Sequence, residues 1–153
     1  MTEQLTLPKY QLRLKKEHNR TYVYDEIRHK YLVLTPEEEV RQRFVHFLAT
    51  EKGYPKSLMM LEHGLTVNGV KLRTDLLVCG GDGAPIMVVE FKAPSIKLTQ
   101  DAFDQIARYN MRFRVSCIAV TNGILHYCCK LDSVSNSWIF LPEIPAYKEL
   151  TAN

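Results

Sequence analysis

The sequence lacks several features that would point to a membrane, secreted or zinc-finger protein. No stretch approaches the ~20 consecutive apolar residues of a membrane helix, and the first five residues lack the charged-then-apolar order of a signal peptide. The four cysteines include no Cys-x-x-Cys pair, which favours buried free thiols over zinc ligands or disulfides. There is no internal repeat or low-complexity tract. These absences predict a cytoplasmic globular protein without membrane contact.

The sequence does contain enough apolar material for one folded core. Its 153 residues are 46% hydrophobic, which supports a single domain. Apolar, β-branched segments, among them strands expected at 116–121 and 124–127, alternate with two helical patterns at residues 35–48 and 99–113, and a last strand is expected at 138–141. The expected fold class is therefore an α/β sandwich.

Positive charge is concentrated at the N-terminus. Residues 1–30 contain seven Lys or Arg and four Asp or Glu, so the net charge of +3 falls entirely within them. Apolar and polar residues alternate over 10–15 and 21–25, which predicts a hairpin turning at 17–20. The hairpin would contact phosphate or cover a sheet edge with charged residues, and we favour the second. A pI near 8.6 predicts modest or partner-assisted affinity for nucleic acid.

A second predicted hairpin brings two carboxylates together. Residues 73–79 and 86–92 are apolar and β-branched, and the segment 80–85 between them is rich in glycine. If the turn centres on Asp82-Gly83, residues whose numbers sum to 165 face each other, and Asp75 lies opposite Glu90. Directly opposed residues have Cβ atoms roughly 4.5–5.5 Å apart, and Lys92 points to the same face as Glu90.

Opposed carboxylates need a cation nearby. Like charges at this range repel unless a cation neutralises them, and Mg²⁺ favours one or two carboxylates completed by waters and phosphate oxygens. Lys92 beside them could orient or activate a water, or stabilise charge that develops on phosphate. Asp75, Glu90 and Lys92 therefore suggest metal-assisted phosphodiester hydrolysis. The alternative is an exposed strand face that carries an ordinary mixture of charges.

The first helix contributes a third candidate carboxylate. Thr35 is the expected N-cap, Pro36 takes the first helical position, and Glu38 completes a capping box. Glu37 falls in the middle of the apolar stripe of this helix, so we expect it to point inward. Because Glu37 lies in the first turn, escape to solvent is the alternative.

The second helix carries polar residues along one edge. Gln105 and Tyr109 are one turn apart, with Arg108 and Arg112 forming a basic row beside them. Taken alone, this is the pattern of an amphipathic helix that packs on a sheet.

In combination, these motifs resemble the PD-(D/E)XK nuclease superfamily, and specifically the N-terminal nuclease domain of type I restriction enzyme R subunits. The motifs are Glu37 on the first helix, Asp75 on a strand, Glu90-Phe-Lys92 on the next strand, and Gln105-x-x-x-Tyr109 on the second helix. The resemblance covers roughly residues 31–130. Thr74 stands where the superfamily name has proline, and this change removes no ligand.

The resemblance implies a restriction-endonuclease-like core: a mixed central β-sheet flanked by helices on both faces. It divides the single domain into a basic extension (1–30), a nuclease core (31–130), and a C-terminal strand and tail (131–153). It further implies that Glu37, Asp75, Glu90 and the carbonyl of Phe91 surround Mg²⁺, with Mn²⁺ as a substitute, and that Lys92 positions the attacking water.

The resemblance also implies DNA as substrate. On the second helix, the residues expected to contact DNA or to order the site are Gln105, Tyr109, Arg108 and Arg112. The restriction subunits continue into a helicase motor and assembly regions that these 153 residues do not contain, so a helicase or other restriction-system subunits are expected partners. The oligomeric state stays open, a dimer included. One alternative is a silent or partner-dependent nucleic-acid-binding module, and another is an unrelated α/β protein with an accidental carboxylate pair.

Overall fold

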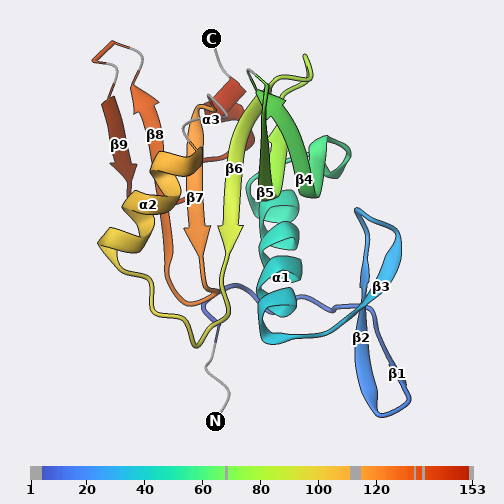
Figure 1. Ribbon diagram of the computed structural model, residues 1–153. Coiled ribbons are helices and arrows are strands. Elements are labelled where there is room, and N and C mark those ends of the chain that lie inside the picture. Colours follow the sequence, from blue (N-terminus) through green and yellow to red (C-terminus); the bar gives the residue numbers. More distant parts are fainter. Residues whose placement is uncertain (1–4, 68, 111–114, 133, 136, 152–153) are drawn as a thin grey trace.

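The structure, a computed structural model, describes residues 5–67, 69–110, 115–132, 134–135 and 137–151 (Figure 1). The helices are α1 (Pro36–Glu51), α2 (Gln100–Asn110) and α3 (Tyr147–Thr151), with one 3₁₀ turn at Lys56–Leu58. The strands are β1 (Leu14–Glu17), β2 (Arg20–Asp25), β3 (Lys30–Val33), β4 (Met59–Val67), β5 (Val70–Cys79), β6 (Pro85–Phe91), β7 (Cys117–Thr121), β8 (His126–Asp132) and β9 (Ser137–Leu141).

A six-stranded mixed sheet forms the centre of the fold. Its strands run in the order β4-β5-β6-β7-β8-β9, with β6 and β7 parallel and the other neighbours antiparallel. Because parallel neighbours cannot be joined by a tight hairpin, the chain passes from β6 to β7 through α2. Helices α1 and α2 lie on opposite faces of this sheet (Figure 1). The predicted mixed sheet with helices on both faces is confirmed.

The β5–β6 hairpin has the predicted register. Its paired residues are Leu76 with Val89, Leu77 with Val88, and Val78 with Met87. The register shifts only between Val78 and Cys79, next to the turn. One step beyond Leu76 and Val89, at the far end of the hairpin from the turn, the same register places Asp75 opposite Glu90.

Alternate residues of the central strands pack into two cores. The core on the α1 face contains Phe44, Leu48, Leu76, Val89 and Phe91. The core on the α2 face contains Leu77, Val88, Phe103, Ile118 and Val120. Full burial of an apolar side chain of this kind contributes roughly 1.5–3 kcal/mol. Along each strand Asp75 and Glu90 follow the alternation of the α2-face residues Leu77 and Val88, and their carboxylates lie where β5 and β6 stop pairing, within reach of Thr74 and the Phe91 N–H.

The N-terminal strands form a separate three-stranded sheet in the order β1-β2-β3. The turn of the predicted hairpin is confirmed: His18 and Asn19 both have positive φ, as the two central residues of a type I′ turn require. The strands of this hairpin do not pair with the main sheet, but Arg28 of the β2–β3 turn lies 3.2 Å from Glu62 on the edge strand β4, so the expectation that the hairpin covers a sheet edge stays a prediction. The carboxylate of Asp25 accepts hydrogen bonds from the backbone N–H groups of Ile27 and Arg28, which turns the chain back so that β3 pairs with β2.

Other elements differ in detail from the sequence prediction. The strand expected at 124–127 begins instead at His126, because the side-chain oxygen of Asn122 accepts from the backbone N–H groups at 124 and 125 and holds them in a turn. The last residues of the predicted second helix, 111–113, lie outside the described residues. The four cysteines are buried free thiols, as predicted. No helix in the described ranges is long and apolar enough to cross a membrane.

Candidate active site

Asp75 and Glu90 lie side by side where β5 and β6 diverge. The backbone N–H of Phe91 donates to Asp75 Oδ2 at 2.9 Å, so a β6 amide holds the carboxylate in place. The hydroxyl of Thr74 donates to Glu90 Oε1 at 3.2 Å. Thr74 is 2% exposed and orients Glu90, a role that the sequence did not reveal because Thr74 stands at a position where the superfamily name has proline.

Burial raises the pKa of Glu90 to about 8, and the neighbouring Asp75 carboxylate adds to the rise. The hydrogen bond from Thr74 and the positive charge of Lys92 act in the opposite direction without cancelling the rise. The protein therefore does not fully compensate the negative charge that it gathers here. A site with this property favours a bound cation.

Lys92 follows directly after β6. Its backbone N–H donates to the carbonyl of Thr121 on β7 at 2.9 Å, which continues the β6–β7 contact by one residue. Its side chain is half-buried, and its charge acts on Glu90. The predicted grouping of Asp75, Glu90 and Lys92 at one place on the hairpin is therefore present.

Phe91 connects this hairpin to α1 on the other face of the sheet. It is 1% exposed, and its ring centroid lies 5.7 Å from that of Phe44 in an edge-to-face arrangement. The guanidinium carbon of Arg41 lies 5.7 Å from the Phe91 centroid. The first turns of α1 are thus fixed against the strand that carries Glu90.

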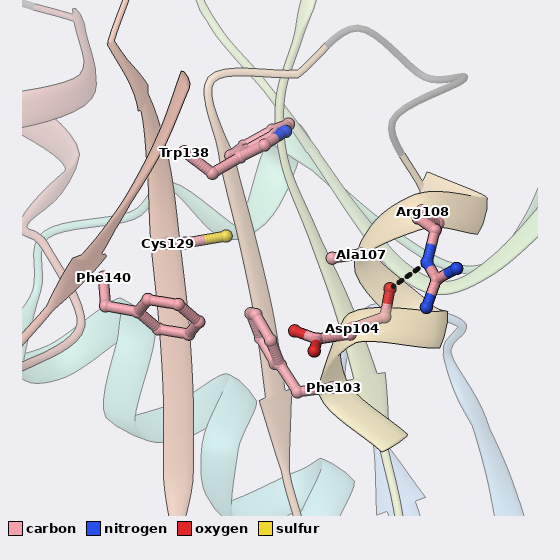
Figure 2. A pocket seen from close by; sticks show the side chains of 7 residues that line it. All are labelled: Phe103, Asp104, Ala107, Arg108, Cys129, Trp138 and Phe140. Carbon is pink, nitrogen blue, oxygen red and sulfur yellow. Dashed lines mark hydrogen bonds between the residues drawn. The ribbon is translucent and has the colours of Figure 1, made fainter. Parts of the chain in front are cut away.

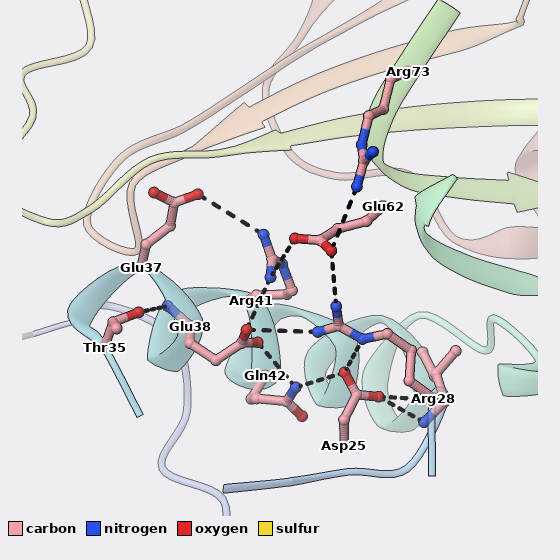
Figure 3. Close-up of polar contacts among 10 residues, drawn as sticks. Asp25, Arg28, Thr35, Glu37, Glu38, Arg41, Gln42, Glu62 and Arg73 are labelled. Atoms are coloured by element: carbon pink, nitrogen blue, oxygen red, sulfur yellow. Dashed lines mark hydrogen bonds and ion pairs between the residues drawn. The ribbon is translucent and has the colours of Figure 1, made fainter. Parts of the chain in front are cut away.

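The placement of Glu37 and Glu38 reverses the expectation (Figure 3). The Glu37 side chain is 46% exposed and lies 3.8 Å from Arg41 Nη2, whereas the Glu38 side chain is only 10% exposed. Thr35 is the N-cap, as predicted, because its hydroxyl accepts from the Glu38 N–H at 3.0 Å. The Glu38 carboxylate, however, accepts from Arg41 at 2.9 Å and Gln42 at 3.1 Å rather than completing a capping box.

The reason for this reversal is that α1 is covered on two sides. Its apolar stripe packs on the main sheet, and a second, polar stripe packs under the turn between β2 and β3. Arg28 from that turn lies 2.8 Å from Asp25 and 3.5 Å from Glu38. The sequence prediction used only the apolar residues of α1, and these place Glu37 toward the main sheet. It did not include the polar side of α1, where Glu38 is buried.

Glu62 joins the same ion-pair network from β4. It has a positive φ of 50° and interrupts the β4–β5 pairing between Leu61 and His63. Its carboxylate lies 3.2 Å from Arg28, 3.7 Å from Arg41 and 3.6 Å from Arg73. Sequence reasoning missed this network, since its members come from four segments, the β2–β3 turn, α1, β4 and β5, that carry no shared motif.

Among the predicted α2 residues, the structure describes the side chains of Gln105 and Arg108 only, and it records no contact between either of them and the carboxylate pair. Gln105 is exposed on α2, the side chain of Tyr109 and the whole of Arg112 lie outside what the structure describes, and Arg108 lines a cavity over β8 and β9. This cavity has a volume of about 360 Å³ (Figure 2). Its lining residues are Phe103, Asp104, Ala107, Arg108, Cys129, Trp138 and Phe140. The DNA-binding or site-ordering role of the α2 residues stays a prediction.

The donor set at the hairpin fits a hard divalent cation. Asp75 and Glu90 offer carboxylate oxygens, and the raised pKa of Glu90 reflects its burial and then the neighbouring Asp75 charge, which a bound cation would offset. Within the described residues, no group of three or more Asp, Glu, His or Cys side chains is placed to hold a metal ion, so Glu37 does not join the pair as a third ligand here. Two carboxylates suffice for Mg²⁺, which keeps several waters and binds substrate phosphate.

The mixed sheet, its two flanking helices and the carboxylate-lysine hairpin define the class of protein as one with a restriction-endonuclease-like fold. Residues 36–145 match the family described as the type I restriction enzyme R protein N terminus. The chain belongs to this family.

A solved structure supports the fold assignment. The chain is similar to a fragment provisionally assigned to the HsdR subunit of a type I restriction enzyme from Vibrio vulnificus YJ016, with a TM-score of 0.55 and 23% sequence identity. The similarity covers 76% of this chain and 24% of that one, so this chain corresponds to about a quarter of its length. No curated protein matches.

Proposed function

We propose that this protein is a Mg²⁺-dependent deoxyribonuclease that hydrolyses phosphodiester bonds within a type I restriction system. The observation that carries the proposal is the convergence of Asp75, Glu90 and Lys92 at the divergent end of the β5–β6 hairpin, in a chain of the R-protein family. Carboxylates paired on adjacent strands and a lysine beside them supply the groups that metal-assisted phosphoryl chemistry needs.

Asp75, Glu90 and the carbonyl of Phe91 would hold the cation, with Mn²⁺ as a substitute for Mg²⁺. When bound, Mg²⁺ would stabilise negative charge on the scissile phosphate and lower the pKa of water. The Phe91 N–H fixes the orientation of Asp75, and Thr74 fixes that of Glu90. Lys92 would place its ammonium beside the phosphate, where it orients the attacking water and offsets developing charge.

DNA is the proposed substrate, and a helicase or other restriction-system subunits are the proposed partners. The family supports this proposal. The solved relative supports it too, because the match covers only 24% of that chain, which leaves room there for further regions. The cytoplasm is the proposed location, because the proposed substrate is DNA. Sequence preference, and a choice between internal and terminal cleavage, are not part of the proposal.

A second candidate is a catalytically silent module that binds or assembles with nucleic acid through the same fold. The observation that favours it is the position of Glu37, which faces Arg41 and is 46% exposed instead of completing the carboxylate group. This candidate requires no metal-dependent cleavage by the chain.

A cleavage assay decides between the two. Supercoiled, linear and single-stranded DNA are incubated with the protein in Mg²⁺, in Mn²⁺ and in EDTA. We expect cleavage with either metal and none in EDTA, with large losses for Asp75→Asn, Glu90→Gln and Lys92→Ala. Asp82→Asn is the matched control, because it removes one carboxylate from the turn of the same hairpin, where Asp82 only accepts from the Ala84 N–H.

The outcomes separate cleanly. Cleavage that persists in EDTA, or a Lys92→Ala protein that cuts at the parent rate, contradicts the assigned mechanism. A parent protein that binds DNA and cuts none of the three forms supports the binding module.

A further inference from the structure

The three-stranded sheet β1-β2-β3 lies ahead of the family match, which begins at residue 36. Val23 and Asp25 of β2 are at most 1% exposed and define its inner face. By alternation, Tyr22 and Tyr24 define the outer face. Direct pairing adds Lys15 opposite Tyr22 and Tyr31 opposite Tyr24. The outer face therefore carries three tyrosines and Lys15, with Val33 opposite Tyr22.

Two cations on this face lie over tyrosine rings. Arg13 Cζ is 4.7 Å from the centroid of Tyr24, and Lys15 Nζ is 4.3 Å from the centroid of Tyr31. The two rings contact each other edge to face at 5.2 Å. Cation–π contact restrains the side chains of Arg13 and Lys15, so these side chains lose less conformational entropy when a ligand binds. The rings thus hold two positive charges in fixed positions.

The outer face carries an excess of positive charge. Arg20 pairs with Glu17 across the β1–β2 turn, which places both on the same face as Lys15. Glu17 also lies 3.4 Å from Lys15, but it is one acid beside three basic residues, namely Lys15 and Arg20 on the strands and Arg13 just before β1. Glu26, whose charge reaches Arg13, is engaged by Lys56. This excess accords with the concentration of the whole net charge of +3 in residues 1–30.

The sheet is tied firmly to the rest of the fold. Asp25 on its inner face accepts from Arg28 at 2.8 Å and from Gln42 of α1 at 3.1 Å, and Arg28 lies 3.2 Å from Glu62 of β4 (Figure 3). In Figure 1 the sheet extends beside the first turns of α1. Its basic face therefore keeps a fixed position relative to the main sheet.

We propose that the outer face of the β1-β2-β3 sheet, built on Arg13, Lys15, Tyr24 and Tyr31, binds the phosphate backbone of duplex DNA. The cations already cover the rings of Tyr24 and Tyr31, so the face offers positive charge to phosphates rather than bare rings to stacking bases. The proposal rests on the proposed function in one respect, namely that the ligand is DNA. It adds a surface outside the family match.

The test is DNA binding by the full chain in EDTA, where metal-dependent cleavage cannot occur. Fluorescence anisotropy with a labelled duplex is measured over a salt series for the parent and for Arg13→Ala/Lys15→Ala. Losing two phosphate contacts should flatten the slope of log K against log salt by about 1.8. The advantage of the parent over the variant should consequently shrink about twelvefold between roughly 50 and 200 mM salt.

Lys16→Ala/Lys30→Ala is the matched control. Both lysines are exposed and alternate with the outer-face residues, so this variant loses the same charge from the other face of the same sheet. Its salt slope should equal that of the parent. Equal losses in the two double variants would show a general charge effect and overturn the proposal, as would a parent protein that does not bind duplex DNA.

Tyrosine variants test the role of the rings without changing charge. Tyr24→Leu/Tyr31→Leu should weaken duplex binding, whereas Tyr24→Phe/Tyr31→Phe should bind like the parent, with melting curves confirming that each variant is folded. If the leucine variant loses single-stranded binding more than duplex binding, the rings stack on bases and the phosphate proposal is wrong.

Failure of this proposal and failure of the nuclease proposal give different results. A parent that cuts DNA, with unchanged binding in Arg13→Ala/Lys15→Ala, supports the nuclease and overturns the binding face. A parent that binds through this face and never cuts supports the face and overturns the nuclease.

Discussion

Replacing Glu90 with glutamine should stabilise the cation-free protein at neutral pH. The Glu90 carboxyl has a folded-state pKa raised from an ordinary 4.5 to about 8, first by burial and then by Asp75. Between these values the folded protein holds a proton that the unfolded chain has released. Unfolding then costs less free energy as pH rises, by about 1.4 kcal/mol per pH unit.

The size of the effect follows from the two pKa values. The difference between the two pKa values should cost about 3 kcal/mol of stability at pH 7 and about 5 kcal/mol above pH 8. Glutamine keeps an oxygen to accept from Thr74 and gains an N–H to donate to Asp75. The variant should lose most of this pH dependence and be the more stable protein at neutral pH.

Urea denaturation in EDTA at several pH values from about 5 to 8 measures this directly. Glu143→Gln is the control, because Glu143 is 76% exposed and its replacement should leave the pH profile of the parent unchanged. A Glu90→Gln protein with the pH profile of the parent would refute the claim that Glu90 is an uncompensated buried carboxyl.

Three further outcomes are expected. In melting experiments Glu38→Ala should cost about 3 kcal/mol, because it removes the carboxylate that accepts hydrogen bonds from the buried side chains of Arg41 and Gln42, whereas Glu37→Ala should cost about 0.5 kcal/mol or less; a larger loss for Glu37 would contradict their assigned environments. Lys92→Ala should retain stabilisation by added Mg²⁺ while cleavage fails, and loss of both would contradict the assignment of Lys92 to the chemical step alone. Gly123→Ala should destabilise by about 1–3 kcal/mol, because φ is +86° and the added Cβ would lie 2.8 Å from two side chains, while Gly81→Ala, which meets open space, should change stability little.

The central hairpin was predictable because all its determinants are local. Two β-branched segments and a glycine-rich turn at Asp82-Gly83 fix the register, and the register alone places Asp75 opposite Glu90. The N-cap at Thr35 and the positive-φ turn at residues 18–19 follow from local chemistry in the same way. Each depends on contacts within a few residues or across one turn.

The surroundings of α1 were not predictable in this way. Glu38 is buried because Arg28 of the β2–β3 turn packs against it. This turn was not predicted, since β3 is only four residues long and has no clear alternating pattern. Glu62 reaches the same group through a positive φ inside a strand, which no propensity rule anticipates for glutamate. Contacts between distant segments determine the burial of Glu38 and the backbone conformation of Glu62, and such contacts cannot be read from local sequence.

Direct observation of a cation tests the central claim of this account. Crystals of the protein soaked in Mn²⁺ should show an anomalous difference peak between the carboxylates of Asp75 and Glu90, and Glu90→Gln crystals treated identically should show it weakened or lost. A peak elsewhere in the parent, or none between these two carboxylates at saturating Mn²⁺, would contradict the proposal that this hairpin holds the metal of a nuclease.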